Sequence, residues 1–146
     1  MNHKEYIAGS LDVINYVRMV TKHNGNFVLP FHKKSQKWDW VGGFVEKGEN
    51  PLEAAKRELF EETGAVDFDI FPVFDHESFN EDGTHFNNAR TYFVIVHEFS
   101  DLLDGSEMEK IGFFDKIPDD FRYNGNREAQ TEFFKRIEKL ASAHFI

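Results

Sequence analysis

The chain has 146 residues, a formal net charge of −9 at pH 7 and no cysteine. Its length fits one compact domain, so we expect a single domain over residues 1–146. The absence of cysteine excludes disulfide bonds, thiolate metal ligands and a cysteine nucleophile. A surface this acidic repels nucleic-acid polymers and anionic membranes, and it would also repel a small phosphate ester unless bound cations intervened.

The sequence carries no mark of export or of membrane insertion. Residues 1–10 are mixed polar and lack the apolar core of a signal peptide. No stretch approaches the roughly 20 apolar residues that span a bilayer. We therefore expect a cytoplasmic protein whose partners are small molecules, with neither a nucleic-acid polymer nor a membrane among them.

The first part of the chain is predicted to form strands joined by short turns. Asn24-Gly25 is a common hairpin turn between two runs of β-branched and apolar residues. Strands are expected at Leu11 to Thr21, Phe27 to Phe31 and Trp38 to Val41. Gly42-Gly43 is expected to end the third strand, ahead of a loop from Phe44 to Asn50.

A helix follows, with a clear start and a clear end. Asn50 suits the N-cap, Pro51 suits the first helical position, and Glu53 completes a capping box. Gly64 suits the left-handed residue that ends a helix at about Thr63. The apolar stripe expected to face the core consists of Leu52, Ala55 and Leu59.

The second half is predicted to return to strands and to close with a helix. Strands are expected at Phe68 to Phe74, Thr91 to Phe99 and Ile111 to Phe114, and a polar loop is expected at Glu77 to Asn88. The spacing of Phe133, Ile137 and Leu140 predicts an amphipathic helix over Arg127 to Ala141. This order of elements indicates an α/β fold in which helices pack on a mixed sheet.

The helix at Pro51 to Thr63 places three carboxylates on one face. Glu58, Glu61 and Glu62 fall at i, i+3 and i+4. Like charges at this spacing cost about 0.2–0.5 kcal/mol per pair, and in the last turn the helix dipole adds about 0.3–1 kcal/mol per charge. A solvated acidic face is the simple interpretation. A divalent cation such as Mg²⁺ or Mn²⁺ would remove all of these costs at once.

The surrounding stretch Gly43 to Ala65 resembles the Nudix box, G-x5-E-x7-R-E-U-x-E-E-x-G-U, in which U is a bulky aliphatic residue. The matching positions are Gly43, Glu49, Arg57, Glu58, Leu59, Glu61, Glu62 and Gly64. Ala65 departs from the last U, and Val41 stands where the family often has proline. Eight fixed positions in one window are a specific signal, and they favour the metal-binding interpretation over the solvated face.

The resemblance implies a Nudix α/β/α sandwich with a central mixed β-sheet and a strand–loop–helix–loop catalytic motif. It implies that Arg57 orients the carboxylates and ties the loop to the helix through Glu49. A surface ion pair between Arg57 and Glu61 is the plainer alternative. The implied metal ligands for Mg²⁺, with Mn²⁺ as a substitute, are Glu58, Glu61, Glu62, the carbonyl of Gly43 or Gly42, and Glu107 from a downstream loop.

The implied reaction is hydrolysis of a diphosphate linkage by metal-activated water. One carboxylate must take the proton of that water. We favour Glu58 or Glu61 as the base, and Glu107 or Glu109 are candidates from the loop before Ile111. For the two loop residues, a plain solvated loop is the alternative.

The substrate is expected to be a small nucleotide. The short chain looks like the MutT-type group, which acts on nucleoside triphosphates, and an oxidised purine such as 8-oxo-dGTP is the first expectation. Asn124 and Asn126 are the candidate base-reading residues because an amide both donates and accepts, although a turn or a helix cap would explain them too. ADP-ribose, sugar nucleotides and dinucleoside polyphosphates are the alternative substrates.

Three other interpretations compete with this hydrolase, and one of them is a structural domain whose acidic helix is incidental. A non-catalytic Nudix module would bind a nucleotide without turnover, although such modules usually lose box glutamates. An isoprenoid diphosphate isomerase in its familiar form uses a cysteine, which this chain lacks. A monomer and a homodimer are both open, because no segment marks an interface.

Overall fold

The computed structural model describes residues 2–122 and 127–143. Its elements, in chain order, are β1 (Asn2–Ile7), β2 (Tyr16–His23), β3 (Asn26–His32), β4 (Val41–Phe44), α1 (Pro51–Thr63), β5 (Ala65–Phe79), β6 (His85–Phe99), β7 (Met108–Phe114) and α2 (Arg127–Ser142). The strands form one sheet in the order β1-β5-β6-β2-β3-β7, and β4 pairs with β2 off this path. The sheet is mixed because β2 runs parallel to β6 while the other strand pairs are antiparallel.

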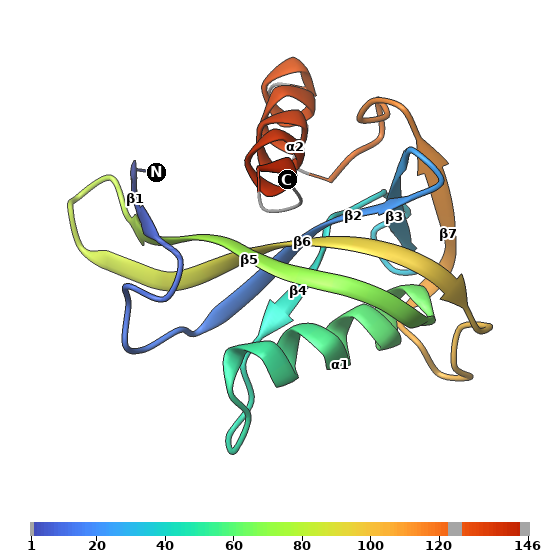
Figure 1. The fold of residues 1–146 in the computed structure, drawn as a ribbon, viewed down its shortest axis with the longest axis horizontal. Helices are drawn as coiled ribbons and strands as arrows, with labels where there is room; N and C mark the ends of the chain where they lie inside the picture. Colours follow the sequence, from blue (N-terminus) through green and yellow to red (C-terminus); the bar gives the residue numbers. More distant parts are fainter. Residues whose placement is uncertain (1, 123–126, 144–146) are drawn as a thin grey trace.

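The two helices cover opposite faces of this sheet. Figure 1 shows α1 below the strands and α2 above them. Adjacent residues of one strand therefore face different helices, since side chains alternate along a strand. On β2, Met19 belongs to the core under α1 and Val20 to the core under α2, and Val94 and Phe93 divide in the same way on β6. The predicted α/β/α sandwich is confirmed.

The core under α1 is aliphatic, and the core under α2 is aromatic. Ala54, Ala55 and Leu59 of α1 pack on the first face with no more than a trace of exposure. Phe27, Phe121 and Phe134 pack on the other face, with Phe134 edge-on to both of the other rings. Much of the chain's phenylalanine therefore fixes α2 to the sheet, as expected of large apolar rings.

Helix α1 begins and ends where the sequence predicts. The side chain of Asn50 accepts a hydrogen bond from the backbone N–H of Glu53, and the Glu53 carboxylate accepts one from the N–H of Asn50. Gly64 adopts a left-handed conformation with φ of 78° and donates its N–H to the carbonyl of Phe60. A side chain at Gly64 would also meet the carbonyl of Ser100 at 2.3 Å, so glycine is required twice over.

The predicted loop at Glu77 to Asn88 is wrong, and strand β1 was not anticipated. Strands β5 and β6 continue to Phe79 and from His85, so only residues 80–84 connect them. The strand ends are polar because charged groups pair between neighbouring strands: Arg90 Nε donates to Asp75 Oδ1 at 2.6 Å, inside the sheet. The segment was predicted to be a loop because it lacks an apolar pattern. Its strands are instead held by pairing with each other and with β1.

The boundaries of the first predicted strands also shift. Strand β2 starts at Tyr16 rather than Leu11. Just before it, the Asn15 N–H donates to the carbonyl of Asn88, and the Asn15 carbonyl accepts from the N–H of Val45. The third strand begins at Val41 and runs through both glycines, so Gly42-Gly43 does not end it. Residues 42 and 43 instead pair with Arg18 and Val17 of β2. The structure thus places the glycine pair inside the sheet.

Replacing Leu59 with alanine tests the packing of α1. Leu59 is fully buried, so Leu59→Ala should lower the free energy of unfolding by about 2–5 kcal/mol. The matched control is Leu52→Ala on the same helix. The apolar spacing predicted that Leu52 faces the core, but it is 40% exposed. That variant should change stability by less than about 1 kcal/mol. Urea denaturation of both variants measures the difference, and equal losses would contradict this packing.

Candidate active site

Arg57 lies at the centre of the loop–helix motif and holds its acidic residues together. Its Nε donates to Glu49 Oε2 at 2.6 Å, and its Nη2 donates to Glu49 Oε1 at 3.0 Å. Its Nη1 reaches Glu58 at 2.9 Å and Glu61 at 3.2 Å. Nη2 also donates to the carbonyl of Phe44 at 3.2 Å. The predicted pairing with Glu49 is present, and the alternative pairing with Glu61 is present as well.

The Arg57–Glu49 pair closes the loop between β4 and α1. Glu49 Oε1 also accepts from the backbone N–H of Glu46 at 2.9 Å. The hydrogen bonds from Arg57, and then the one from Glu46, hold the pKa of Glu49 below its usual value. The same contacts raise the pKa of Arg57, so both groups stay charged. The loop is therefore fixed to the helix by a bidentate ion pair.

Glu62 is a partly buried acid. Its Oε1 accepts from the backbone N–H of Gly42 at 2.8 Å. Burial raises the pKa of Glu62 well above its usual value, against the effect of that hydrogen bond, and Glu58, Asp39 and Glu107 raise it further. Such a carboxylate gains from a nearby positive charge more than an exposed one does.

Glu58 shares this environment and lies against the glycine backbone. Burial raises the pKa of Glu58, although Arg57 opposes the change. A Cβ atom on Gly43 would lie 2.3 Å from Glu58 Oε1, so any residue other than glycine would displace the carboxylate. The glycine thus brings the backbone of β4 and the acid of α1 into direct contact.

The predicted metal ligands do not form a closed cage in this conformation. Among residues 2–122 and 127–143, no three acidic or imidazole side chains converge as a ready metal site. Glu58 and Glu61 face Arg57, Glu62 faces Gly42, and the Glu61 side chain is 48% exposed. The neighbouring acids help to raise the pKa of Glu58 and of Glu62, but Glu58 and Glu61 are held by Arg57 while Glu62 is held by the Gly42 N–H.

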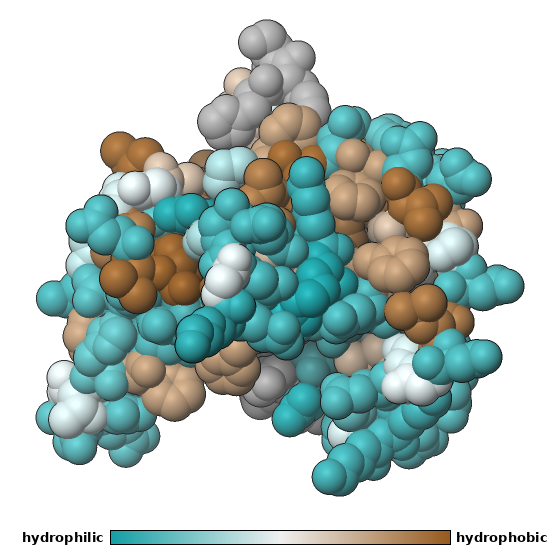
Figure 2. All heavy atoms as spheres, turned by 90° about the horizontal axis from the view of Figure 1, so that it is seen from below, coloured by the Kyte–Doolittle hydropathy of each residue, from teal (hydrophilic) through white to brown (hydrophobic). Residues whose placement is uncertain are grey.

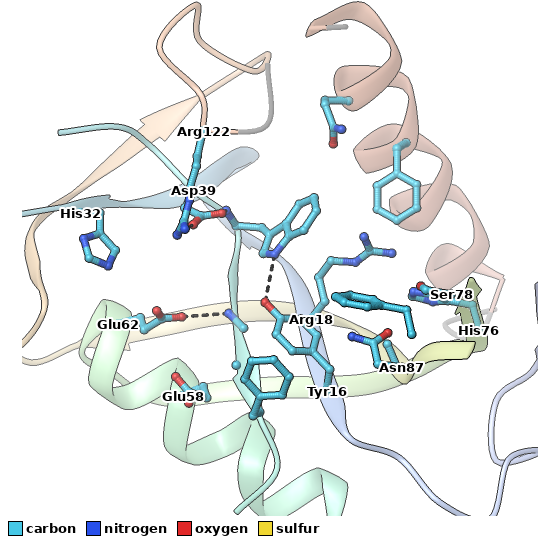
Figure 3. Close-up of a pocket in the computed structure, with 18 of the residues that line it drawn as sticks. Tyr16, Arg18, His32, Asp39, Glu58, Glu62, His76, Ser78, Asn87 and Arg122 are labelled. Carbon is cyan, nitrogen blue, oxygen red and sulfur yellow. Dashed lines mark hydrogen bonds and ion pairs between the residues drawn. The ribbon is translucent and has the colours of Figure 1, made fainter. Parts of the chain in front are cut away.

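A pocket of about 940 Å³ opens beside these acids. Glu58, Glu62 and the two glycines line one end of it, as Figure 3 shows for the labelled acids. Arg18, His76 and Ser78 of the sheet line the pocket away from these acids (Figure 3), and Phe133 of α2 lines it beside Arg18. A volume of this size fits a nucleotide-sized ligand. The pocket is acidic at one end, and near the other it carries Arg18, aromatic rings and Glu5, whose carboxylate is paired with Arg136.

Sequence reasoning missed several residues that line this pocket. Arg18 is an isolated arginine in an apolar strand, and nothing in its spacing marks it. Asp39 is nearly buried, its pKa raised by that burial, and Arg122 Nη1 lies 3.3 Å from its Oδ2. Trp40 and Phe86 also line the pocket. The topology, rather than any local motif, brings these residues together.

The other predicted site residues lie in different places. Glu107 lines the pocket, with its side chain 83% exposed and 3.8 Å from His32. Glu109 is exposed on β7 and does not line the pocket. Asn124 and Asn126, the predicted base-reading pair, lie outside the described residues.

Comparison with known proteins decides the family. The model of the NUDIX domain matches residues 16–115, which is most of the chain. The chain belongs to the NUDIX domain family. The prediction that it is a Nudix hydrolase, a class of enzyme acting on phosphorus anhydrides, is confirmed at this level. The finer assignment to the MutT-type group has no such support.

The Nudix relatives differ in the substrates that their names give. A curated RNA pyrophosphohydrolase of Mesorhizobium japonicum is 53% identical over 34 residues, which is 23% of this chain and 20% of that protein. A mutant of the Bacillus subtilis pyrophosphohydrolase BsRppH superposes with a TM-score of 0.76 at 18% identity, covering 97% of this chain and 90% of that one. A C. elegans Ap4A hydrolase gives 0.61 at 15% identity, covering 88% and 98%. At these identities the structural matches establish the shared fold.

On the α1 side of the molecule, the described residues form no large hydrophobic patch. Seen from the α1 side, the molecule is mostly hydrophilic, and its hydrophobic residues form small separate groups (Figure 2). Neither α1 nor α2 has the length and hydrophobicity of a membrane-spanning helix.

The raised pKa of Glu62 gives a prediction for the metal-free protein. A carboxyl whose pKa is higher in the folded than in the unfolded state stabilises the fold while it is protonated, and this contribution is lost as the pH rises through the folded pKa. Glu62→Gln should therefore melt at a higher temperature than the wild type at about pH 8, and the gain should shrink below about pH 4. Thermal unfolding in EDTA measures this. Exposed Glu109→Gln is the control, and a gain that did not depend on pH would contradict the account.

Proposed function

We propose that this Nudix hydrolase is a divalent-metal-dependent pyrophosphohydrolase that cleaves a phosphoanhydride of a nucleoside triphosphate. The observation that carries the proposal is the pair of partly buried acids, Glu58 and Glu62, at the acidic end of a nucleotide-sized pocket. Their raised pKa values reflect negative charge held out of water. A polyanionic phosphate could not approach them without a cation between.

The donors at this end suit Mg²⁺ or Mn²⁺. Both ions prefer hard oxygen ligands, and carboxylates and backbone carbonyls are such ligands. The residues that would hold the ions are Glu58, Glu61 and Glu62, with the Gly43 backbone and Glu107 as further ligands. When bound, the ions neutralise phosphate oxygens and activate a water molecule. Glu61 would have to turn from Arg57 to join them, and its exposure leaves room for that movement.

We propose that Arg57 and Glu49 position the acids rather than bind phosphate. Arg57 is already occupied by Glu49, Glu58 and the Phe44 carbonyl, so it is not free to hold a phosphate group. The proton of the attacking water would pass to Glu58 or Glu61. Both also line a smaller cavity of about 300 Å³ under residues 103–108, which gives a second approach to the same acids.

The substrate proposal rests on the size and chemistry of the pocket. Aromatic side chains such as Trp40 and Phe133 suit a base, and the acidic end suits the phosphates. An oxidised purine such as 8-oxo-dGTP remains the first expectation from the sequence. Dinucleoside polyphosphates, ADP-ribose and a triphosphorylated RNA end are the alternatives, and two relatives are named for the first and last of these.

A substrate panel tests the proposed function. The wild-type protein is incubated with Mg²⁺ and nucleoside triphosphates, 8-oxo-dGTP, ADP-ribose, Ap4A or a triphosphorylated RNA oligonucleotide, and released phosphate and pyrophosphate are measured. We expect metal-dependent release of pyrophosphate from triphosphates, abolished by EDTA. Tight nucleotide binding with no turnover of any substrate would instead identify a non-catalytic module.

Single substitutions test the roles of the acids. Glu58→Gln and Glu62→Gln should each lower kcat by about 10²-fold or more, since each removes a charge that a bound ion or a proton transfer requires. Glu109→Gln is the matched control because Glu109 is exposed and outside the pocket. Steady-state kinetics at saturating Mg²⁺ measure the effects. A wild-type rate in Glu62→Gln would remove that residue from the proposed site.

A further inference from the structure

Arg18 is a cation at the far end of the pocket, with few partners. It lies on β2 opposite Gly42 of β4, the residue whose N–H binds Glu62. Figure 3 shows Arg18 directed away from Glu58 and Glu62 and toward α2. One pair of strands therefore places the acid end and the arginine end at fixed positions relative to each other.

Two aromatic rings hold the guanidinium in place. The Arg18 Cζ atom lies 4.7 Å from the ring centroid of Trp40 and 4.5 Å from that of Phe133. The Trp40 indole donates to Tyr16 Oη at 3.4 Å, which fixes that ring in turn. A guanidinium stacked between rings keeps its plane, and its N–H edge points along the plane.

The hydrogen-bonding capacity of Arg18 is largely unused within the protein. Its Nη2 donates to Thr91 Oγ1 at 3.3 Å, and its buried Nε has no partner. In the part of the chain that the structure describes, no carboxylate lies within ion-pair distance of it. Burial lowers the pKa of Arg18 to about 10, so the group stays charged at neutral pH. A partly buried cation with no ion-pair partner and with an unpaired buried N–H loses hydration that a ligand with acceptors would restore.

The surroundings of Arg18 favour a base over a second phosphate. Thr91 of β6 is paired with both Arg18 of β2 and Phe74 of β5, so these three residues form one row across the sheet, and Arg18 and Phe74 of this row line the pocket. The Phe74 ring packs on Phe133 with centroids 6.4 Å apart. A phosphate would lose its hydration against these rings, whereas the flat faces of a purine fit them.

We propose that Arg18 is a specificity-determining residue that recognises a 6-oxopurine base by donating to its O6 and N7 atoms. This inference rests on the proposed function, because it assumes that a nucleotide occupies the pocket. Arginine binds the O6 and N7 acceptors of guanine in a bidentate manner. Adenine presents an amino donor at the same position, which would face the donors of Arg18. Guanine and hypoxanthine nucleotides are therefore preferred over adenine nucleotides.

Binding of mononucleotides tests this without catalysis. GMP, IMP and AMP have no anhydride and share the ribose and phosphate, so the differences between their affinities in a calorimetric titration in EDTA report on the base. We expect wild-type protein to bind GMP and IMP about 5- to 100-fold more tightly than AMP, the range of one bidentate base contact. In Arg18→Met this ratio should fall to about one. If hydrolysis fails in the substrate panel but this ratio holds, the proposed function fails and the base-reading role stands.

Two further variants complete the test. Arg18→Lys keeps the charge but loses the fork of donors, so it should lose most of the preference even if Arg18→Met does not fold. Lys110→Met is the matched control: Lys110 also stacks on rings, 4.9 Å from the Phe31 centroid, and does not line the pocket. It should keep the wild-type ratio. Equal binding of GMP and AMP by the wild type, a ratio unchanged in Arg18→Lys, or an equal weakening of all three ligands would overturn the proposal.

Discussion

The arrangement of the site depends on the hydrogen bonds of Arg57. One guanidinium contacts Glu49 with two donors and Glu58 and Glu61 with a third, and it also contacts the Phe44 carbonyl. Without this cation, acids crowded on one helical turn would repel one another. With it, the loop after β4 is fixed to α1, and the carboxylates stay near the strand backbone. The same guanidinium therefore both fixes the loop to the helix and positions the acids of the site.

The sheet supplies the backbone against which the acids of α1 lie and the arginine at the other end of the pocket. Strand β4 borders the pocket together with α1. Its two glycines let the acids approach its backbone closely: Gly42 donates to Glu62, and Gly43 has no Cβ to push Glu58 away. On the other side of the same strand pair, Arg18 extends toward α2. The aromatic core under α2 then closes the far end of the pocket. The carboxylate end and the aromatic end of the pocket therefore both lie on the paired strands β2 and β4.

The part of the fold that the sequence predicts best is the local motif. Asn50, Pro51 and Gly64 mark the helix ends because capping depends on nearby residues, and the Arg57–Glu49 pair follows from the box spacing. The polar strand ends near Asp75 and the edge strand β1 could not be predicted in the same way, since cross-strand partners stabilise them. Arg18 and Asp39 were missed for a related reason. Their roles come from residues far apart in the sequence, which only the topology brings into one pocket.

The most direct test is a crystal structure with Mn²⁺ and a non-hydrolysable nucleotide, recorded at a wavelength where manganese scatters anomalously. The account predicts an anomalous peak in contact with oxygens of Glu58 and Glu62, beside the Gly43 backbone. An empty cluster, with Glu58 and Glu61 still bound to Arg57 while the nucleotide is in place, would contradict it.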